Sequence, residues 1–341
     1  MSTYDEARER IRALHGRGAD APLGREAVAD YAAVTARHRA LYWSVPGPLL
    51  FNTVDAHARL GRALLSTRAP AALHAQLAEA AAESLLLAGR IAFFDLHALS
   101  AAGEYLRAAS DAADAVDVAD DNALAAAVLT HRAFIPAYAG SAQDARDLVN
   151  AARARGGRAL SRVQSGWMHA VAAEVEARFG DGQTAMTLLA QAAEDLSAAD
   201  ATNDQPRPDW LDYFDQSRHD AFTGYCAQAA GLPDRAEAAL TRALEALPPT
   251  ADKQSAIVHA DLAAVLLSAH RIDECVAHLQ QALTIVDQQW YATAVHRIRA
   301  LRTRLSPHRR LPEVADLDER LRALTRARPA AASPTPRRLA A

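Results

Sequence analysis

Small and bulky apolar residues recur along the chain in a pattern that predicts paired helices. A small residue is followed by a bulky residue four positions later and by Ala three positions after that, with another small residue twelve positions upstream. Residues at i, i+4 and i+7 lie on one face of a helix, so each triplet predicts one stripe of a second helix. The triplets are Ala101/Tyr105/Ala108, Ala145/Val149/Ala152, Ala185/Leu189/Ala192, Ala236/Leu240/Ala243 and Cys275/Leu279/Ala282, with upstream partners Gly89, Ala133, Ala173, Gly224 and Ala263.

The spacing of the triplets predicts a stacked helical array. They begin at residues 101, 145, 185, 236 and 275, so the intervals are 44, 40, 51 and 39 residues. Periods of this size are typical of helical repeats. Gly140, Gly180 and Gly231 each precede a triplet by five residues and predict left-handed caps between the paired helices. No segment alternates apolar and polar residues between turn signals, so no strand is predicted.

The same patterns predict the positions of the helices. A first pair is expected at 25–44 and 49–68, around a Pro46-Gly47-Pro48 turn. Pro136 should kink or end its helix, and an insertion near 199–208 accounts for the longest interval. The repeat pairs are predicted at 71–95/98–117, 122–139/142–155, 159–179/182–198, 209–230/233–247 and 253–269/272–287, and two further helices at 290–305 and 313–326.

The chain divides into three predicted regions. Residues 1–24 form an N-terminal extension, and residues 25–326 form the helical array, with recognisable repeats at about 71–287. Residues 327–341 are rich in Pro and Ala and are expected to be disordered.

The turn-to-Ala pattern resembles the tetratricopeptide repeat over about residues 70–305. The resemblance implies an all-α fold, a right-handed superhelix of antiparallel helix pairs of the α-solenoid type. The intervals exceed the 34 residues of that family, so HEAT-like pairs stay open as an alternative.

A narrower resemblance concerns residues 31–66, 209–244 and 254–283. These segments resemble the C-terminal sensory region of actinobacterial helix-turn-helix (XRE-type) transcriptional regulators, and the resemblance spans roughly residues 28–306. Those regulators carry a DNA-binding domain first, whereas "MSTYDEARERIRALHGRG" holds no such motif. The resemblance therefore implies a sensor-like protein without the DNA-binding domain.

The repeat register selects residues that should face the concave groove. Arginine binds carboxylates in bidentate fashion and aromatic rings supply apolar contact, so a peptide, a small-molecule signal or a partner protein is the expected ligand. A competing interpretation is that the aromatic residues pack between repeats and the arginines pair with acidic neighbours. The selected residues are Glu83, Arg90, Phe94, Tyr138, Trp167, Glu174, Arg178, Arg218 and Tyr225.

Two further segments are candidates for contacts. Residues 209–215, DWLDYFD, are interpreted as the packed first turn of a helix, with a lid over the groove as the alternative. Arginines within residues 297–310 could meet nucleic acid, but a solvated helix that caps the array is favoured. Lys253 is the only lysine of the chain, and we attribute this to a GC-rich genome.

Composition and motifs argue against catalysis. The net charge is −4, and the sequence holds no CxxC, no HExxH and no phosphate-binding glycine motif. Arg–His pairs of the ribonuclease type occur about as often as chance predicts. Two cysteines without an export signal or a spanning apolar run fit the cytoplasm. We expect a non-catalytic regulatory protein without cofactor, metal or membrane; a pure scaffold, nucleic-acid binding by the Arg-rich helix and homodimerisation stay open.

Overall fold

The computed structural model describes residues 23–115, 122–201 and 207–326, and the regular structure of these residues is entirely helical. The predicted extension at 1–22 and tail at 327–341 lie outside the described residues. The helices are α2 (Arg25–Leu41), α3 (Gly47–Leu65), α4 (Ala71–Arg90), α5 (Leu99–Asp114), α6 (Ala123–Ala139), α7 (Ala142–Gly156), α8 (Arg162–Arg178), α9 (Gly182–Ala201), α10 (Gln216–Ala229), α11 (Pro233–Ala246), α12 (Asp252–Ser268), α13 (Ile272–Gln288), α14 (Ala292–Arg304) and α15 (Pro312–Arg326), with short turns η1 (Ile91–Asp95), η2 (Gly157–Ala159) and η3 (Ser306–His308).

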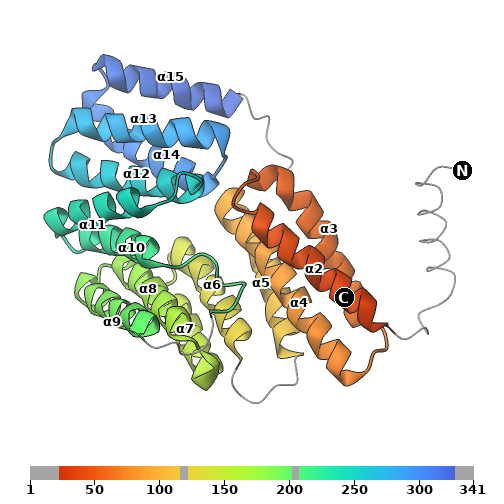
Figure 1. Cartoon of the computed structure of the whole chain (residues 1–341). Coiled ribbons are helices and arrows are strands. Elements are labelled where there is room, and N and C mark those ends of the chain that lie inside the picture. The colour runs from red at the N-terminus through yellow and green to blue at the C-terminus, as the bar shows by residue number, and fades with distance from the viewer. Residues whose placement is uncertain (1–22, 116–121, 202–206, 327–341) are drawn as a thin grey trace, which may run out of the picture.

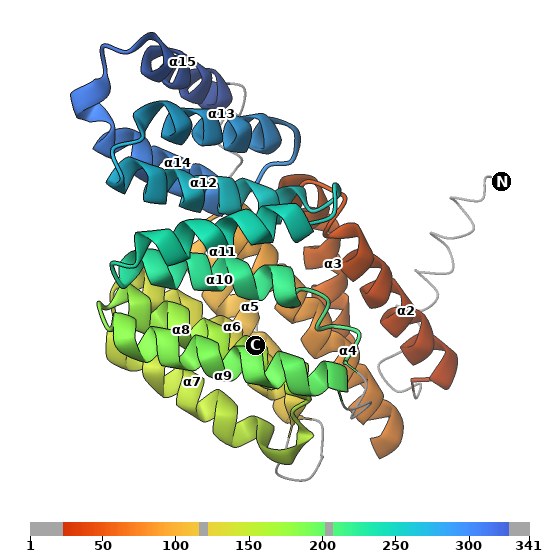
Figure 2. The same cartoon turned by 60° about the vertical axis from the view of Figure 1, so that its left-hand side comes forward.

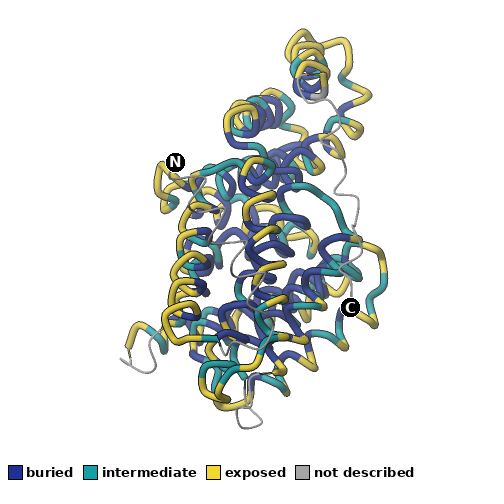
Figure 3. Tube along the Cα trace, turned by 90° about the vertical axis from the view of Figure 1, so that its right-hand side faces the viewer, coloured by how far each residue is buried: buried dark blue, intermediate teal, exposed yellow. Residues whose placement is uncertain are grey.

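The helices form a stack of antiparallel pairs, which confirms the predicted fold class. Five repeats, α4–α5, α6–α7, α8–α9, α10–α11 and α12–α13, follow one another, and the first helices contact in series to α14 (Figure 1). The stack curves so that α12 and α14 approach the helices at the N-terminal end of the chain (Figure 2). Buried segments gather inside the curve and exposed segments lie along the outside (Figure 3).

Small residues on the stripes explain how the helices of a pair approach one another. In the second to fifth repeats every residue of the predicted triplets is buried. A Cβ atom added to Gly224 of α10 would overlap the Leu240 side chain of α11. The middle residue of the triplet therefore occupies the space that glycine leaves, as the sequence predicted.

The first repeat differs from the prediction by one residue. Its buried stripe is Ala102/Leu106/Ala109, and a Cβ atom on Gly89 would lie 2.6 Å from Leu106 Cγ. The π-helical turn η1 accommodates one extra residue before α5, which shifts the stripe. With this shift, a left-handed residue precedes the stripe by five positions in all five repeats, at His97, Gly140, Gly180, Gly231 and His270.

Two predicted boundaries are wrong. Helix α10 begins at Gln216 rather than 209, because residues 207–215 are not helical. Gly47 and Pro48 belong to the first turn of α3, where proline is tolerated because the first N–H groups of a helix lack partners. Pro136 lies inside α6 without ending it, and α6 reaches the left-handed cap at Gly140, in agreement with the predicted range 122–139.

The last repeats close onto the first through side-chain contacts. Trp290 Nε1 donates to the Asp95 carbonyl at 2.8 Å, and Thr293 Oγ1 donates to the Phe94 carbonyl at 2.9 Å. The Lys253 ammonium donates to the Tyr42 carbonyl at 2.7 Å. Because these pairs lie 195 or more positions apart, the curvature of the stack brings both ends to one inner surface.

Candidate ligand-binding site

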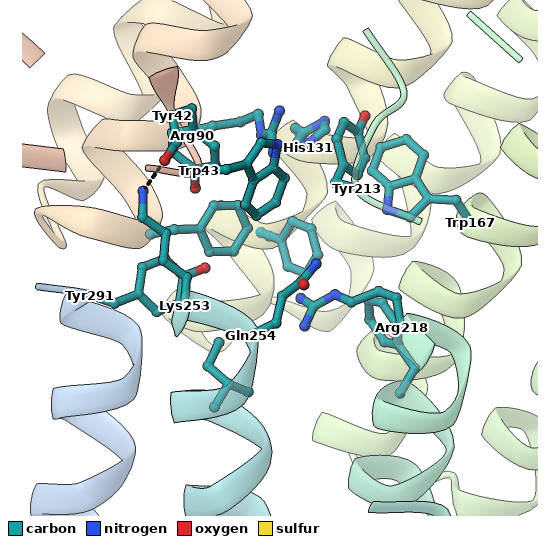
Figure 4. A pocket seen from close by; sticks show the side chains of 14 residues that line it. Tyr42, Trp43, Arg90, His131, Trp167, Tyr213, Arg218, Lys253, Gln254 and Tyr291 are labelled. Carbon is teal, nitrogen blue, oxygen red and sulfur yellow. Dashed lines mark hydrogen bonds between the residues drawn. The ribbon is translucent and has the colours of Figure 1, made fainter. Parts of the chain in front are cut away.

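A cavity opens on the inner surface where the two ends of the stack meet (Figure 4). It holds about 510 Å³ of space not filled by atoms, part of it open to solvent. Four residues selected from the sequence line it: Arg90, Phe94, Trp167 and Arg218. The other lining residues are Tyr42, Trp43, His131, Phe134, Tyr213, Phe222, Lys253, Gln254, Ile257 and Tyr291. The cavity is therefore an aromatic chamber with three basic side chains in its wall.

A second cavity adjoins the first along α10 and α12 and holds about 240 Å³ of space not filled by atoms, part of it open to solvent. Two further residues selected from the sequence, Glu174 and Tyr225, line it, and Arg218 lines both cavities. Asp261 and Arg297 complete its polar wall and form an ion pair with each other. Six of the nine residues selected from the sequence thus line the two adjoining cavities, and Arg178 and Tyr138 lie beside them, next to Tyr225 and Glu174.

Arg178 is held by neighbours rather than free in the groove. Its guanidinium donates to Glu174 at 2.8 and 3.1 Å and lies 3.7 Å from the centroid of the Tyr138 ring. Burial would raise the pKa of Glu174, but Arg178 and Arg297 outweigh burial and keep it below its usual value. Arg178, Glu174 and Tyr138 thus contact one another, as the competing interpretation of the sequence predicted.

Glu83 lies apart from both cavities. It pairs with Arg39 at 2.5 Å and lines a smaller cavity together with Trp210. Burial raises the pKa of Glu83 to about 7, with the carboxylates of Glu79 and Asp209 adding to this effect and Arg39 opposing it.

The Arg-rich helix α14 is part of the inner wall, which corrects the interpretation as a solvated cap. Arg297 points inward, pairs with Asp261 and lies 4.9 Å from the centroid of the Tyr225 ring. Arg302 pairs with Asp318 of α15 at 2.5 Å. Because α14 also carries Thr293, it joins the closure of the stack rather than standing free in solvent.

The most important residues that sequence reasoning missed are Lys253 and Asp95. They form a 2.7 Å ion pair, and both are buried, with exposed fractions of 3% and 0%. Burial raises the pKa of Asp95 and lowers that of Lys253, and the attraction between the two opposes both shifts. The available signal was that Lys253 is the only lysine in an arginine-rich chain, which the sequence analysis attributed to genome composition rather than to a site for a compact ammonium group.

Residues 207–215, called the strap below, cross the inner surface. The Trp43 indole donates to Asp212 at 2.9 Å, and the Arg90 guanidinium lies 4.2 Å from the Tyr213 ring centroid. Trp210 and Phe214 are buried, so the strap forms part of the cavity wall. The sequence pattern predicted that residues 209–215 are packed, but it placed them in the first turn of a helix, whereas they are not helical.

Arg218 differs from the other basic residues of the two cavities. Arg90, Lys253 and Arg297 each have a carboxylate within 4.0 Å, whereas Arg218 has none among the described residues. Its guanidinium lies 5.2 Å from the Phe222 ring centroid, and in Figure 4 it points toward Gln254. Its charge acts on the carboxylates of Glu174 and Asp261 across the second cavity, but among the described residues its guanidinium forms no ion pair within 4.0 Å. Its donors are therefore available in both cavities.

Two searches of the described residues gave negative results. No group of three or more His, Cys, Asp or Glu side chains in this part of the chain could hold a metal ion. None of its helices combines the length and apolar character needed to cross a membrane.

The fold was compared with known proteins. No family model matches the chain, and no curated protein matches it. BtubC (BKLC) from P. vanneervenii aligns with a TM-score of 0.47 at 15% identity, over 70% of this chain and 90% of that chain. NprR, solved in complex with its cognate peptide NprX, aligns with a TM-score of 0.53 at 12% identity, over 94% of this chain and 85% of that chain. The similarity to NprR covers nearly the whole chain and confirms a tetratricopeptide-like helical-repeat fold.

Proposed function

We propose that this protein is a non-catalytic regulatory protein that binds a carboxylate-bearing ligand, a peptide in the first instance, on its concave surface. The observation that carries the proposal is Arg218, whose guanidinium lines both cavities without an acidic partner among the described residues. An arginine fork with free donors in a partly enclosed apolar site is suited to a carboxylate.

The surroundings of Arg218 define the rest of the ligand. Gln254 adds an amide that can donate to the same carboxylate, and Phe222 and Ile257 supply apolar walls. The ligand is therefore a peptide with a free carboxyl terminus and an apolar last side chain, or a small acid of the same shape. The peptide complex of NprR, a protein of the same fold, supports a peptide as the ligand class.

The proposed role is regulatory. The resemblance of residues 31–66, 209–244 and 254–283 to sensory regions of actinobacterial regulators supports a link to transcriptional control in the cytoplasm. Ligand binding where the ends of the stack meet would favour one curvature of the array over another, because it can stabilise only the state that it binds more tightly. A scaffold role would require no such ligand. Direct nucleic-acid binding by α14 loses support because Arg297 and Arg302 are engaged in ion pairs.

Paired peptide pools test the proposal. One pool has free C-terminal carboxylates and the other has the same sequences with C-terminal amides. We expect the protein to enrich members of the first pool, and Arg218→Ala to remove this preference. Arg235→Ala, an exposed arginine of the outer helix α11, should keep it. Equal enrichment of both pools, or a preference that survives Arg218→Ala, would contradict the proposal.

A further inference from the structure

The strap, residues 207–215, contacts the inner surface in the manner of a bound peptide. Asp212 accepts from the Trp43 indole at 2.9 Å and lies 4.0 Å from the Arg90 guanidinium. The Tyr213 ring lies 5.2 Å from the Trp167 ring and 5.4 Å from the His131 ring, centroid to centroid. One acidic and one adjacent aromatic residue thus contact four different parts of the array: the turn after α2, and helices α4, α6 and α8.

The strap is held mainly by its side chains. Among the described residues, its backbone forms no hydrogen bond to the backbone of the helices that it crosses. Leu211 N donates to the Pro208 carbonyl within the strap, and His219 N of α10 donates to the Asp215 carbonyl. Such an attachment resembles recognition of an extended peptide by side-chain pockets more than it resembles a packed helix.

The polar groups of the strap are not fully matched by its surroundings. Asp212 Oδ1 and the Tyr213 hydroxyl are buried and have no hydrogen-bond partner in the described part of the chain. A buried polar group without a partner disfavours the state that contains it. The seated strap is therefore replaceable by a segment whose groups are better matched.

We propose that the surface formed by Trp43, Arg90, His131 and Trp167 is a second peptide-binding surface. Its ligand is a partner segment in which an aspartate precedes an aromatic residue, and the chain's own strap occupies the surface until that segment displaces it. The basic and aromatic character of the surface matches an acidic and aromatic ligand. The four residues line the same cavity as Arg218, but they come from other elements than α10 and α12, and none of the strap contacts described above involves Arg218.

The strap itself supplies the probe. In the test variant, a glycine–serine segment of equal length replaces residues 209–214. A fluorescein-labelled synthetic peptide with the strap sequence, RPDWLDYFD, is expected to bind this variant saturably and the wild-type chain about tenfold more weakly or not at all. The same peptide with Asp212→Asn and Tyr213→Ser should also bind about tenfold more weakly. Arg235→Ala, on the outer helix α11, should leave binding to the test variant unchanged. The peptide carries a C-terminal amide, so its binding does not depend on the carboxylate recognition of the proposed function.

No binding to a variant that circular dichroism shows to be folded, or equal binding to wild type, would overturn the inference. Should the test variant not fold, hydrogen exchange of full-length Asp212→Asn decides. We expect amides within 210–215 to exchange about tenfold faster than in wild type, with α6 and α8 unchanged. Slow and unaltered exchange in the strap would show that it is a fixed part of the core and would equally overturn the inference.

Discussion

Lys253 and Asp95 form a buried ion pair of 2.7 Å between the fifth and the first repeat, although residues 95 and 253 lie 158 positions apart. The Lys253 ammonium also donates to the Tyr42 carbonyl and lies 3.6 Å from the centroid of the Tyr42 ring. One side chain therefore connects α12 with both η1 and the end of α2. The ion pair therefore takes part in the closure of the stack, together with the hydrogen bonds of Trp290 and Thr293.

Lys253→Met should lower the free energy of unfolding by about 3–5 kcal/mol, because it leaves the Asp95 carboxylate buried without its partner. The double variant Lys253→Met/Asp95→Leu should recover most of this loss, since both charges are then absent. Urea denaturation followed by circular dichroism measures both effects. Arg59→Ala, which removes the partly exposed i,i+4 pair with Asp55, is the control and should cost less than about 1 kcal/mol. A Lys253→Met variant as stable as this control would contradict the role of the pair in closure.

Arg178→Ala should lower the stability of the fold, whereas Arg218→Ala should leave the stability nearly unchanged and affect ligand binding. Removal of Arg178 leaves the buried Glu174 without the partner that donates to it, which should cost about 3 kcal/mol. Removal of Arg218 breaks no ion pair among the described residues and should change stability by less than about 1 kcal/mol. Thermal unfolding of the two variants checks this difference. Comparable destabilisation by Arg218→Ala would mean that Arg218 has a structural role.

Gly224→Ala should destabilise the protein by about 1–3 kcal/mol, because its methyl group would overlap the Leu240 side chain. This loss should appear although alanine is favoured over glycine within a helix by about 1 kcal/mol. Gly103→Ala in α5 is the matched control, since its Cβ atom would meet only Ile135 Cδ1 at 3.7 Å, and it should be neutral or stabilising. The midpoints of denaturant unfolding measure both effects. A Gly224→Ala variant more stable than wild type would show that α10 and α11 can move apart without loss of stability.

Glu83 should make stability fall as the pH rises from about 4.5 to about 7. Its folded-state pKa is raised to about 7, so the folded protein binds this proton more tightly than the unfolded chain does. Deprotonation through this window should cost up to about 3 kcal/mol, and nothing further above it. Glu83→Gln should remove this part of the pH dependence, as measured by unfolding midpoints between about pH 4.5 and 8. The exposed Glu194→Gln variant should keep the wild-type slope, and an unchanged slope in Glu83→Gln would contradict the assignment.

The repeated elements could be predicted from sequence because each is specified locally. The stripe of small residues requires a close helix pair, and a glycine five positions earlier requires a left-handed cap; Gly140, Gly180 and Gly231 all have positive φ. The register of the first repeat was missed by one residue because the π-helical turn η1 adds a residue before α5. The fifth repeat kept its predicted register, although a left-handed His270 replaces the glycine there. A left-handed histidine has no sequence signature comparable to glycine, and neither has a π-helical turn.

The inner surface could be predicted only in part because its contacts depend on the curvature of the whole stack. Arg90, Trp167 and Arg218 follow from the register of single helices, and they line the cavity. Trp43 and Lys253 meet the same cavity because the array closes, and no local pattern contains that information. The ion pair of Arg178 with Glu174 is local, at i and i+4, and sequence reasoning did foresee it as an alternative.

The contact of the fifth repeat with the first affects how the array unfolds as well as its shape. In a linear stack each repeat interacts only with its neighbours, and the terminal repeats fray independently. Here the ion pair of Lys253 and Asp95 joins the first of five consecutive repeats to the fifth. Each of these two repeats therefore has a contact at its outer end, and neither can unfold without breaking it. We therefore expect α4 to α13 to unfold together as one cooperative unit, although each repeat is specified by local sequence.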